Sequence, residues 1–261
     1  MNNISHYLII DTHTHLSDPV FDADRMEVIK NSTKSGIIKI ISVSETIEDA
    51  QRNIEFAKTY HELCPAAGLY PSHLDFNQLE KMMSFIRENR SKLCAIGEVG
   101  LDFWIIKDAS EKEIQQKIFS QFIDLSLELD LPLNVHSRSA GRHAVSLLLE
   151  KGAQKVQLHA FDGKTSAALP AVEAGFFFSV PPSIVHSRQK QKLIKQLPLS
   201  CLLVETDSPV LGIDPNKRNV PANIFYSIDA IAEIKGIKKE EVVEIVYENT
   251  MRLYGNIISV D

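Results

Sequence analysis

Short apolar segments rich in β-branched residues alternate along this chain with segments whose apolar residues recur every three or four positions. Eight segments have the first, strand-like character: 7–10, 37–43, 64–69, 93–99, 131–135, 155–158, 176–180 and 201–204. The spacing predicts helices over 22–35, 46–61, 76–90, 111–130, 142–151, 165–174, 187–196, 222–235 and 239–253. Eight strand and helix units within 261 residues are what a closed parallel (β/α)8 barrel of the TIM type requires.

No linker rich in proline, glycine or serine interrupts this alternation, so residues 1–261 are predicted to form one α/β domain. A doubly wound open sheet is the alternative architecture for such a pattern. The G-x-G-x-x-G phosphate loop that is typical of open sheets follows none of the predicted strands. The sequence therefore favours the eight-stranded parallel barrel.

Polar side chains gather where the predicted strands end, and the chemistry of a (β/α)8 barrel takes place at those ends. In "DTHTHL" two histidines stand two positions apart, so their side chains share one face of an extended segment. The strand ends carry six candidate metal ligands: His13, His15, Glu98, His136, His159 and Asp207. A lone histidine at a strand end is usually a core or capping residue, and only the joint pattern indicates a metal site.

Imidazole nitrogens and carboxylate oxygens bind borderline divalent ions such as Zn²⁺, Mn²⁺ and Fe²⁺. Six ligands exceed what one tetrahedral ion requires, whereas two ions that share a carboxylate would use all six. Paired ions suit the hydrolysis of phosphate esters because they hold both the attacking and the leaving oxygen. The ligand set predicts a cofactor of two divalent metal ions per subunit.

The charge balance excludes recognition of nucleic acid by a global positive field. The chain has 28 basic and 34 acidic residues, a formal net charge of −6, so local groups would have to bind any polyanion. Cys64, Cys94 and Cys201 lie in or beside apolar runs without CxxC spacing, which is typical of reduced thiols in the cytoplasm. The first ten residues have no basic region and only a short apolar stretch, and no eighteen apolar residues run together, so we expect a soluble cytoplasmic protein without membrane association or an obligate protein partner.

Six motifs in order resemble the TatD-related metal-dependent hydrolases of the amidohydrolase superfamily: "DTHTHL", "AIGEVGLDF", "NVHSRSAGR", "LHAFDG", "FFFSVPPSI" and "ETDSPVLG". The resemblance runs from the first strand to the "KRNVP" loop at 217–221 and covers nearly the whole chain. The "HSRSAGR" and "QKQKL" stretches are similar to the third TatD-domain-containing deoxyribonuclease subgroup. The resemblance implies a two-metal hydrolase of phosphodiester bonds in DNA, with 3′→5′ exonuclease action as one form of that activity.

Carried over to this sequence, the resemblance makes His13 and His15 ligands of one ion and makes His136 and His159 ligands of the other. It makes Glu98 the bridging carboxylate. Asp207 would complete the first site and take a proton from the attacking water, so Glu98 and Asp207 are the implied catalytic residues. The implied ions are Zn, Mn, Mg, Fe or Ni.

Candidate substrate contacts are predicted less directly. Arg138 follows a ligand by two positions and its guanidinium matches phosphate oxygens, although a salt bridge is the alternative role. Arg218 stands in a loop that resembles the family's Arg-Asn-Glu-Pro motif. Tyr70 occupies the position of the histidine in the family's Gly-x-His-Pro motif, and His73 is predicted to substitute for that histidine.

Three further side chains have two interpretations each. Glu205 shares a strand face with Asp207, so it either orients a ligand or fills the barrel. Phe103 and Trp104 follow "GEVGLD" and either stack on a base or pack beneath a loop.

Three functions remain open from the sequence. The first is hydrolysis of DNA ends or short oligonucleotides. The second is hydrolysis of a small ester, lactone, amide or phosphate on the same barrel, since barrels of this type support many reactions. The third is a catalytically feeble scaffold that binds metal for stability or binds a partner protein, which the full ligand set disfavours.

Overall fold

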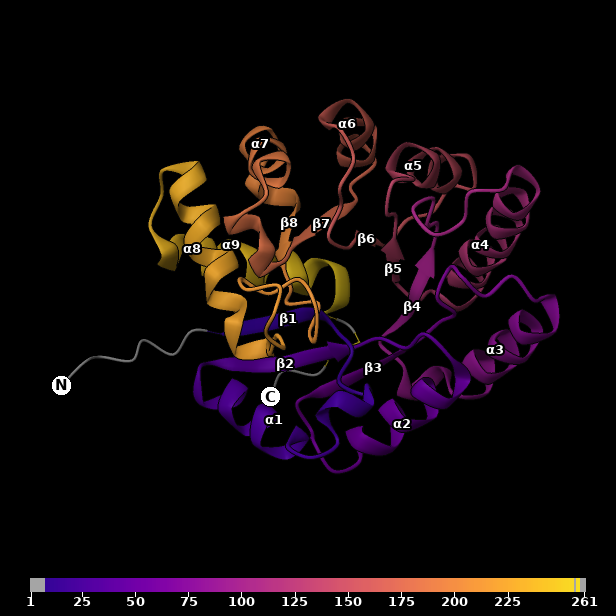
Figure 1. Cartoon of the computed structure of the whole chain (residues 1–261), viewed down its shortest axis with the longest axis horizontal. Helices are drawn as coiled ribbons and strands as arrows, with labels where there is room; N and C mark the ends of the chain where they lie inside the picture. The colour runs from indigo at the N-terminus through magenta and orange to yellow at the C-terminus, as the bar shows by residue number, and fades with distance from the viewer. Residues whose placement is uncertain (1–7, 256, 259–261) are drawn as a thin grey trace.

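A computed structural model describes residues 8–255, 257 and 258, and these form a barrel of eight parallel strands surrounded by helices (Figure 1). Each strand pairs with the next in chain order, from the first to the eighth. The strands are β1 (Ile9–Thr14), β2 (Ile37–Ser42), β3 (Leu63–Ala67), β4 (Ala95–Gly100), β5 (Leu133–His136), β6 (Val156–Leu158), β7 (Phe177–Val180) and β8 (Leu202–Val204). The predicted TIM barrel is confirmed, and the open-sheet alternative is excluded.

The barrel closes between β1 and the segment that follows β8. Thr14 forms a parallel bridge with Ser208, and the His15 amide donates to the Ser208 carbonyl at 2.7 Å. The Asp207 amide donates to the His13 carbonyl at 2.9 Å. The closing seam therefore brings three of the six candidate ligands together through the backbone alone.

Nine helices among the described residues lie outside the barrel or beneath it (Figure 1). They are α1 (Arg25–Lys34), α2 (Ile47–Ala57), α3 (Phe76–Glu88), α4 (Ala109–Leu129), α5 (Gly141–Glu150), α6 (Thr165–Glu173), α7 (Arg188–Gln196), α8 (Ile224–Lys235) and α9 (Lys239–Tyr254). Five 3-10 turns lie at Pro19–Phe21, Arg90–Lys92, Pro182–Val185, Leu199–Cys201 and Pro221–Asn223. Each helix matches its predicted range to within a few residues.

The first strand extends further than predicted. The apolar run ends at Ile10, but β1 continues through buried Asp11 and Thr12 to Thr14. Asp11 is held there because its carboxylate accepts the Thr206 amide at 2.9 Å and the Thr206 hydroxyl at 2.5 Å. His13 thus lies inside the strand and is fully buried, rather than beyond the strand's end.

Alternating strand residues face the inside and the outside of the barrel. Ile40 belongs to the large apolar core between strands and helices, whereas its neighbour Ile41 belongs to a smaller cluster with Leu203 and Tyr254 of α9. The Tyr254 hydroxyl also donates to Gln157 Oε1 at 2.7 Å. This smaller cluster fills one end of the barrel and leaves polar side chains at the other.

No helix among residues 8–255, 257 and 258 is long and apolar enough to cross a lipid bilayer.

Candidate metal centre

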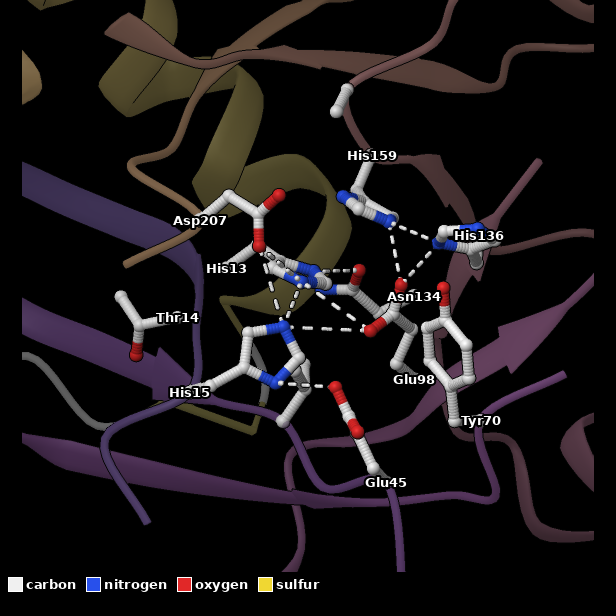
Figure 2. Close-up of polar contacts among 12 residues, drawn as sticks. His13, Thr14, His15, Glu45, Tyr70, Glu98, Asn134, His136, His159 and Asp207 are labelled. Carbon is white, nitrogen blue, oxygen red and sulfur yellow. Dashed lines mark hydrogen bonds and ion pairs between the residues drawn. The ribbon is translucent and has the colours of Figure 1, made fainter. Parts of the chain in front are cut away.

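The six candidate ligands converge at the carboxyl ends of the strands, although they come from five different strands or strand ends (Figure 2). Five of them are buried, and His15 is partly exposed. Their donor atoms form three overlapping groups in which all atoms lie within 4.8 Å of one another. The structure therefore brings together the residues that the strand-end pattern singled out.

Glu98 lies at the centre of this cluster and faces a pair of histidines with each oxygen (Figure 2). Its Oε1 lies 2.5 Å from His136 Nδ1 and 2.7 Å from His159 Nε2. Its Oε2 lies 3.5 Å from His15 Nε2 and 3.9 Å from His13 Nε2. One carboxylate thus separates two groups of donors, which is the arrangement a bridging ligand requires.

Asp207 completes the group on the Oε2 side. Its Oδ1 lies 3.3 Å from His15 Nε2 and 3.5 Å from His13 Nε2. Its backbone has a φ of 53°, in the left-handed region, and its amide hydrogen bond to the His13 carbonyl holds this conformation. The ring of His13 also stacks on that of His159, with centroids 3.9 Å apart.

The distances on the Oε2 side of Glu98 fit a metal ion. Ligands about 2.0–2.2 Å from a tetrahedral ion lie roughly 3.3–3.6 Å from one another. The separations among His13, His15, Asp207 and Glu98 Oε2 run from 3.2 to 3.9 Å and match that spacing. The atoms on the Oε1 side are closer, at 2.5 to 3.1 Å, which is hydrogen-bond spacing.

The Nε2 atom of His13 carries no proton and faces the other candidate ligands. Its Nδ1 lies 2.7 Å from Asn134 Oδ1, and the Asn134 amide donates to the Thr12 carbonyl at 2.9 Å, which fixes the orientation of the Asn134 side chain. Because an amide oxygen only accepts, Nδ1 must carry the proton of the neutral ring. Burial, with His159 beside it, lowers the pKa of His13 to about 3. His13 is therefore neutral, and its Nε2 is available as a ligand.

Two of the other three histidines, His136 and His15, also have polar groups behind them, whereas the buried His159 Nδ1 has no hydrogen-bond partner among the residues that the structure describes. His136 Nε2 lies 3.0 Å from Asp102 Oδ2, and His15 Nδ1 lies 3.7 Å from Glu45 Oε1. A polar partner on the outer nitrogen orients a ligating imidazole and increases its basicity.

We did not predict these roles of Asp102 and Asn134. Both stand inside quoted motifs, "AIGEVGLDF" and "NVHSRSAGR", and a search for outer partners within those motifs would have found them.

The carboxylates also change the protonation of two rings. Burial lowers the pKa of His15, but its contact with Asp207 and the charge of Glu98 outweigh burial and raise that pKa to about 9. For His136, Glu98 and Asp102 outweigh burial in the same way and raise the pKa to about 10. The pKa of Glu98 lies well below its usual range, because His159 and His136 overcome the effect of burial. Without an ion, the cluster balances its carboxylates with protonated imidazoles.

Above the cluster is a cavity of about 480 Å³, with both charged and apolar lining residues. Among the described residues, the lysine and arginine side chains that line this cavity are those of Arg138 and Lys190. Lys190 projects from α7, donates to the Ala160 carbonyl, and has a pKa lowered by burial. The quoted "QKQKL" stretch contains Lys190, but sequence reasoning gave it no role because nothing in helical periodicity indicates which way this residue points.

Of the predicted substrate contacts, Arg138 lines the cavity, whereas His73 and Arg218 do not. The His73 ring contacts Gln78 Oε1 at 3.1 Å. Arg218 forms an ion pair with Asp24 and donates to the Val20 carbonyl at 2.8 Å, which directs its guanidinium to the start of α1. A substrate role for either residue would require it to leave these partners.

Two residues with open interpretations also lie beside the cluster. Tyr70 lines the cavity, and its hydroxyl donates to Asp102 Oδ2 at 3.0 Å. Glu205 accepts the Ala160 amide at 2.8 Å and the Ser179 hydroxyl at 2.5 Å, and its Oε2 lies 4.0 Å from His159 Nδ1. Glu205 thus supports the loop that carries His159, so its contacts favour an orienting role over simple barrel filling.

A parallel barrel that gathers four histidines and a shared carboxylate at the carboxyl ends of its strands belongs to the class of metal-dependent hydrolases. More specifically, the chain is a member of the TatD related DNase family, whose model matches residues 10–255. The resemblance read from the six motifs is confirmed.

Similar proteins support this assignment over nearly the full chain. Human "Deoxyribonuclease TATDN3" is 41% identical over 258 residues, which are 94% of this chain and 94% of that protein. "Uncharacterized metal-dependent hydrolase YabD" of Bacillus subtilis is 32% identical over 95% of this chain and 99% of its own. The crystal structure of YJJV, a TatD homolog from Escherichia coli, has a TM-score of 0.88 at 27% identity and covers 96% of this chain and 99% of its own. The protein is a TatD-type metal-dependent hydrolase.

Proposed function

We propose that this protein hydrolyses phosphodiester bonds in DNA, with DNA ends or short oligonucleotides as substrates and two divalent ions as cofactor. The observation that carries the proposal is Glu98, whose two oxygens each face a separate pair of histidines. A single structural ion would close four-coordinate and leave ligands unused. The human relative that is named a deoxyribonuclease supports DNA as the substrate.

His13, His15, Asp207 and one oxygen of Glu98 would hold one ion, and His136, His159 and the other oxygen would hold the second. When bound, such ions supply Lewis-acid activation of water and neutralise charge on the phosphate. The donor set suits Zn, Mn, Fe or Ni, and it accepts Mg through its carboxylates.

Asp207 is the proposed proton acceptor for the attacking water. Despite burial, its contact with His15 and the charge of His13 keep its pKa below the usual value, so the carboxylate is ionised at neutral pH. Arg138 and Lys190 are the proposed contacts to phosphate oxygens, since both line the cavity. Lys190 is a further proposed contact, while His73 and Arg218 stay predicted contacts that would have to leave Gln78 and Asp24 to reach a substrate.

The direct test is digestion of oligonucleotides labelled at either end, single-stranded and double-stranded, by protein that has been stripped of metal and reloaded with each ion. Cleavage that depends on the ion and disappears in Glu98→Gln and Asp207→Asn supports the proposal. Glu173→Gln, an exposed carboxylate on α6, is the matched control and retains full activity. Equal cleavage by the wild type and by a folded Glu98→Gln variant would refute the proposal.

A second candidate is the hydrolysis of a small ester, lactone, amide or phosphate. The cavity volume of about 480 Å³ favours it, because pockets for small molecules typically span about 300–1,000 Å³. Tyr70 at the usual histidine position also favours a changed substrate. Parallel assays of esters, lactones and oligonucleotides under identical metal loading separate the two functions.

We also propose that residues 1–261 act as one hydrolase domain, because barrel and helices together draw on residues from Ile9 to Tyr254. The proposed compartment is the cytoplasm, which the three buried free cysteines support.

A further inference from the structure

We propose that Trp104 is a stacking platform for a nucleobase of single-stranded DNA, next to the phosphate that occupies the cavity. This inference rests on the proposed function and specifies the form of its substrate. The platform consists of Trp104 with the nearby cations Arg138 and Lys107.

Trp104 is exposed where a packed tryptophan would be buried. It lies in the loop between β4 and α4, and 58% of its surface is accessible, while its neighbour Ile105 is 48% exposed. A large aromatic side chain that packs beneath a loop would have most of its surface covered. The structure therefore favours the stacking interpretation for Trp104 over packing.

Two cations lie over the indole ring at cation–π distance. The Arg138 guanidinium carbon and Lys107 Nζ each lie 5.1 Å from its centroid. Arg138 also lines the cavity above the candidate ligands, so one side chain connects the cavity to the platform. A nucleic acid strand presents the matching groups, a phosphate for the guanidinium and a flat base for the indole.

The loop that carries Trp104 is fixed to the candidate metal centre. Asp102 Oδ1 accepts the amides of Trp104 and Ile105 at 2.8 and 2.9 Å. The other oxygen of the same carboxylate lies 3.0 Å from His136 Nε2. The Phe103 amide donates to the Arg138 carbonyl at 3.0 Å, which ties this loop to the next one. The platform is thus held at a set position relative to the cluster before any substrate arrives.

The platform suits a single strand better than a duplex. Bases within a duplex already stack on one another and offer no free face, whereas an unpaired base can stack on an exposed aromatic ring. The local cations also compensate for the overall charge of −6, which repels a polyanion elsewhere on the protein.

The experiment uses the intrinsic fluorescence of Trp104, which is the single tryptophan of the chain. Metal-loaded protein is titrated with a short phosphorothioate oligodeoxynucleotide, which resists cleavage, and with an abasic counterpart of equal charge. We expect the base-bearing strand to quench the fluorescence and to bind roughly ten-fold or more tightly than the abasic strand. Equal quenching and equal affinity for the two strands would overturn the inference.

Variants provide the second measurement, by anisotropy of a labelled oligonucleotide. Trp104→Ala is expected to weaken binding roughly ten-fold or more, Trp104→Phe to restore most of it, and the matched control Ile105→Ala to bind like the wild type. Oligonucleotide binding and cleavage that are normal in Trp104→Ala but absent in Glu98→Gln would overturn the platform and leave the proposed function intact. A wild type that neither binds nor cleaves DNA would overturn both.

Discussion

His136 Nε2 lies 3.0 Å from Asp102 Oδ2, and the opposite nitrogen of the same ring lies 2.5 Å from Glu98 Oε1. The ring is therefore fixed between two carboxylates, one at the centre of the candidate metal cluster and one behind it. A histidine held in this way has a set ring orientation and a set direction for its ligating atom.

This relationship predicts the effect of Asp102→Asn. Removal of the charge behind His136 is expected to lower metal affinity or activity about 10-fold to 100-fold, the usual cost of losing an outer partner. Metal titration followed by an activity assay at saturating metal measures the two effects separately. Asp124→Asn, an exposed carboxylate on α4, is the control, and an unchanged Asp102→Asn variant would contradict the orienting role of Asp102.

Glu98→Gln is expected to lower kcat by about 10³-fold or more, because a bridging carboxylate contributes several kcal/mol through the ions that it holds. The amide keeps the size of the side chain but loses the charge that faces both histidine pairs. Circular dichroism confirms that the variant is folded. A folded variant within ten-fold of wild-type kcat would show that Glu98 is not the bridge.

Lys190→Met is expected to lower kcat/KM for a phosphodiester about ten-fold while the metal content stays the same, since the side chain lines the cavity but contacts none of the six candidate ligands directly. Steady-state kinetics with elemental analysis measure both quantities. Lys192→Met, an exposed lysine on the same helix, is the matched control. A loss of metal in Lys190→Met would assign the residue to the centre rather than to the substrate.

Metal uptake is expected to release protons. In the metal-free protein the pKa of His15 is about 9 and that of His136 is about 10, so both rings are protonated at pH 7. A ligating nitrogen must lose its proton, so loading at pH 7 releases about two protons per subunit, and metal affinity weakens as the pH falls. Calorimetry in buffers of different ionisation enthalpy counts these protons. Loading without proton release would show that both rings are already neutral in the metal-free protein, and would contradict their raised pKa values.

The raised pKa values of His15 and His136 also affect the stability of the metal-free protein at high pH. Both pKa values lie above the ordinary value of about 6.5, so the contribution of these rings to the free energy of unfolding is complete below that pH. This contribution to the free energy of unfolding is lost as the pH rises through 9 and 10, where the two rings lose their protons. Thermal unfolding from pH 7 to 10 is expected to show a falling Tm without metal and a smaller fall with metal.

The barrel and the six candidate ligands could be predicted because each depends on a local pattern. The alternation of side chains along a strand predicted that His13 and His15 share one face. In (β/α)8 barrels the functional residues lie at the carboxyl ends of the strands, which predicted that the other four candidate ligands meet at one rim of the barrel: Glu98, His136, His159 and Asp207. The end of β1 was predicted too early, since Thr206, which follows β8, holds Asp11 in extended conformation. Such a long-range contact leaves no trace in local composition.

Part of the surroundings of the cluster depends on loop conformation and could not be predicted. Arg218 follows a family-like motif, yet Asp24, nearly two hundred residues earlier in the chain, pairs with it outside the cavity. Lys190 reaches the cavity only because α7 packs with that face toward Ala160.

The proposed function requires Glu98 to lie between two metal ions. An anomalous difference map from crystals of the protein loaded with Zn²⁺ or Mn²⁺ tests it most directly. We expect two peaks, one among His13, His15 and Asp207 and one between His136 and His159, with an oxygen of Glu98 beside each. A single peak, or none at full loading, would contradict the account.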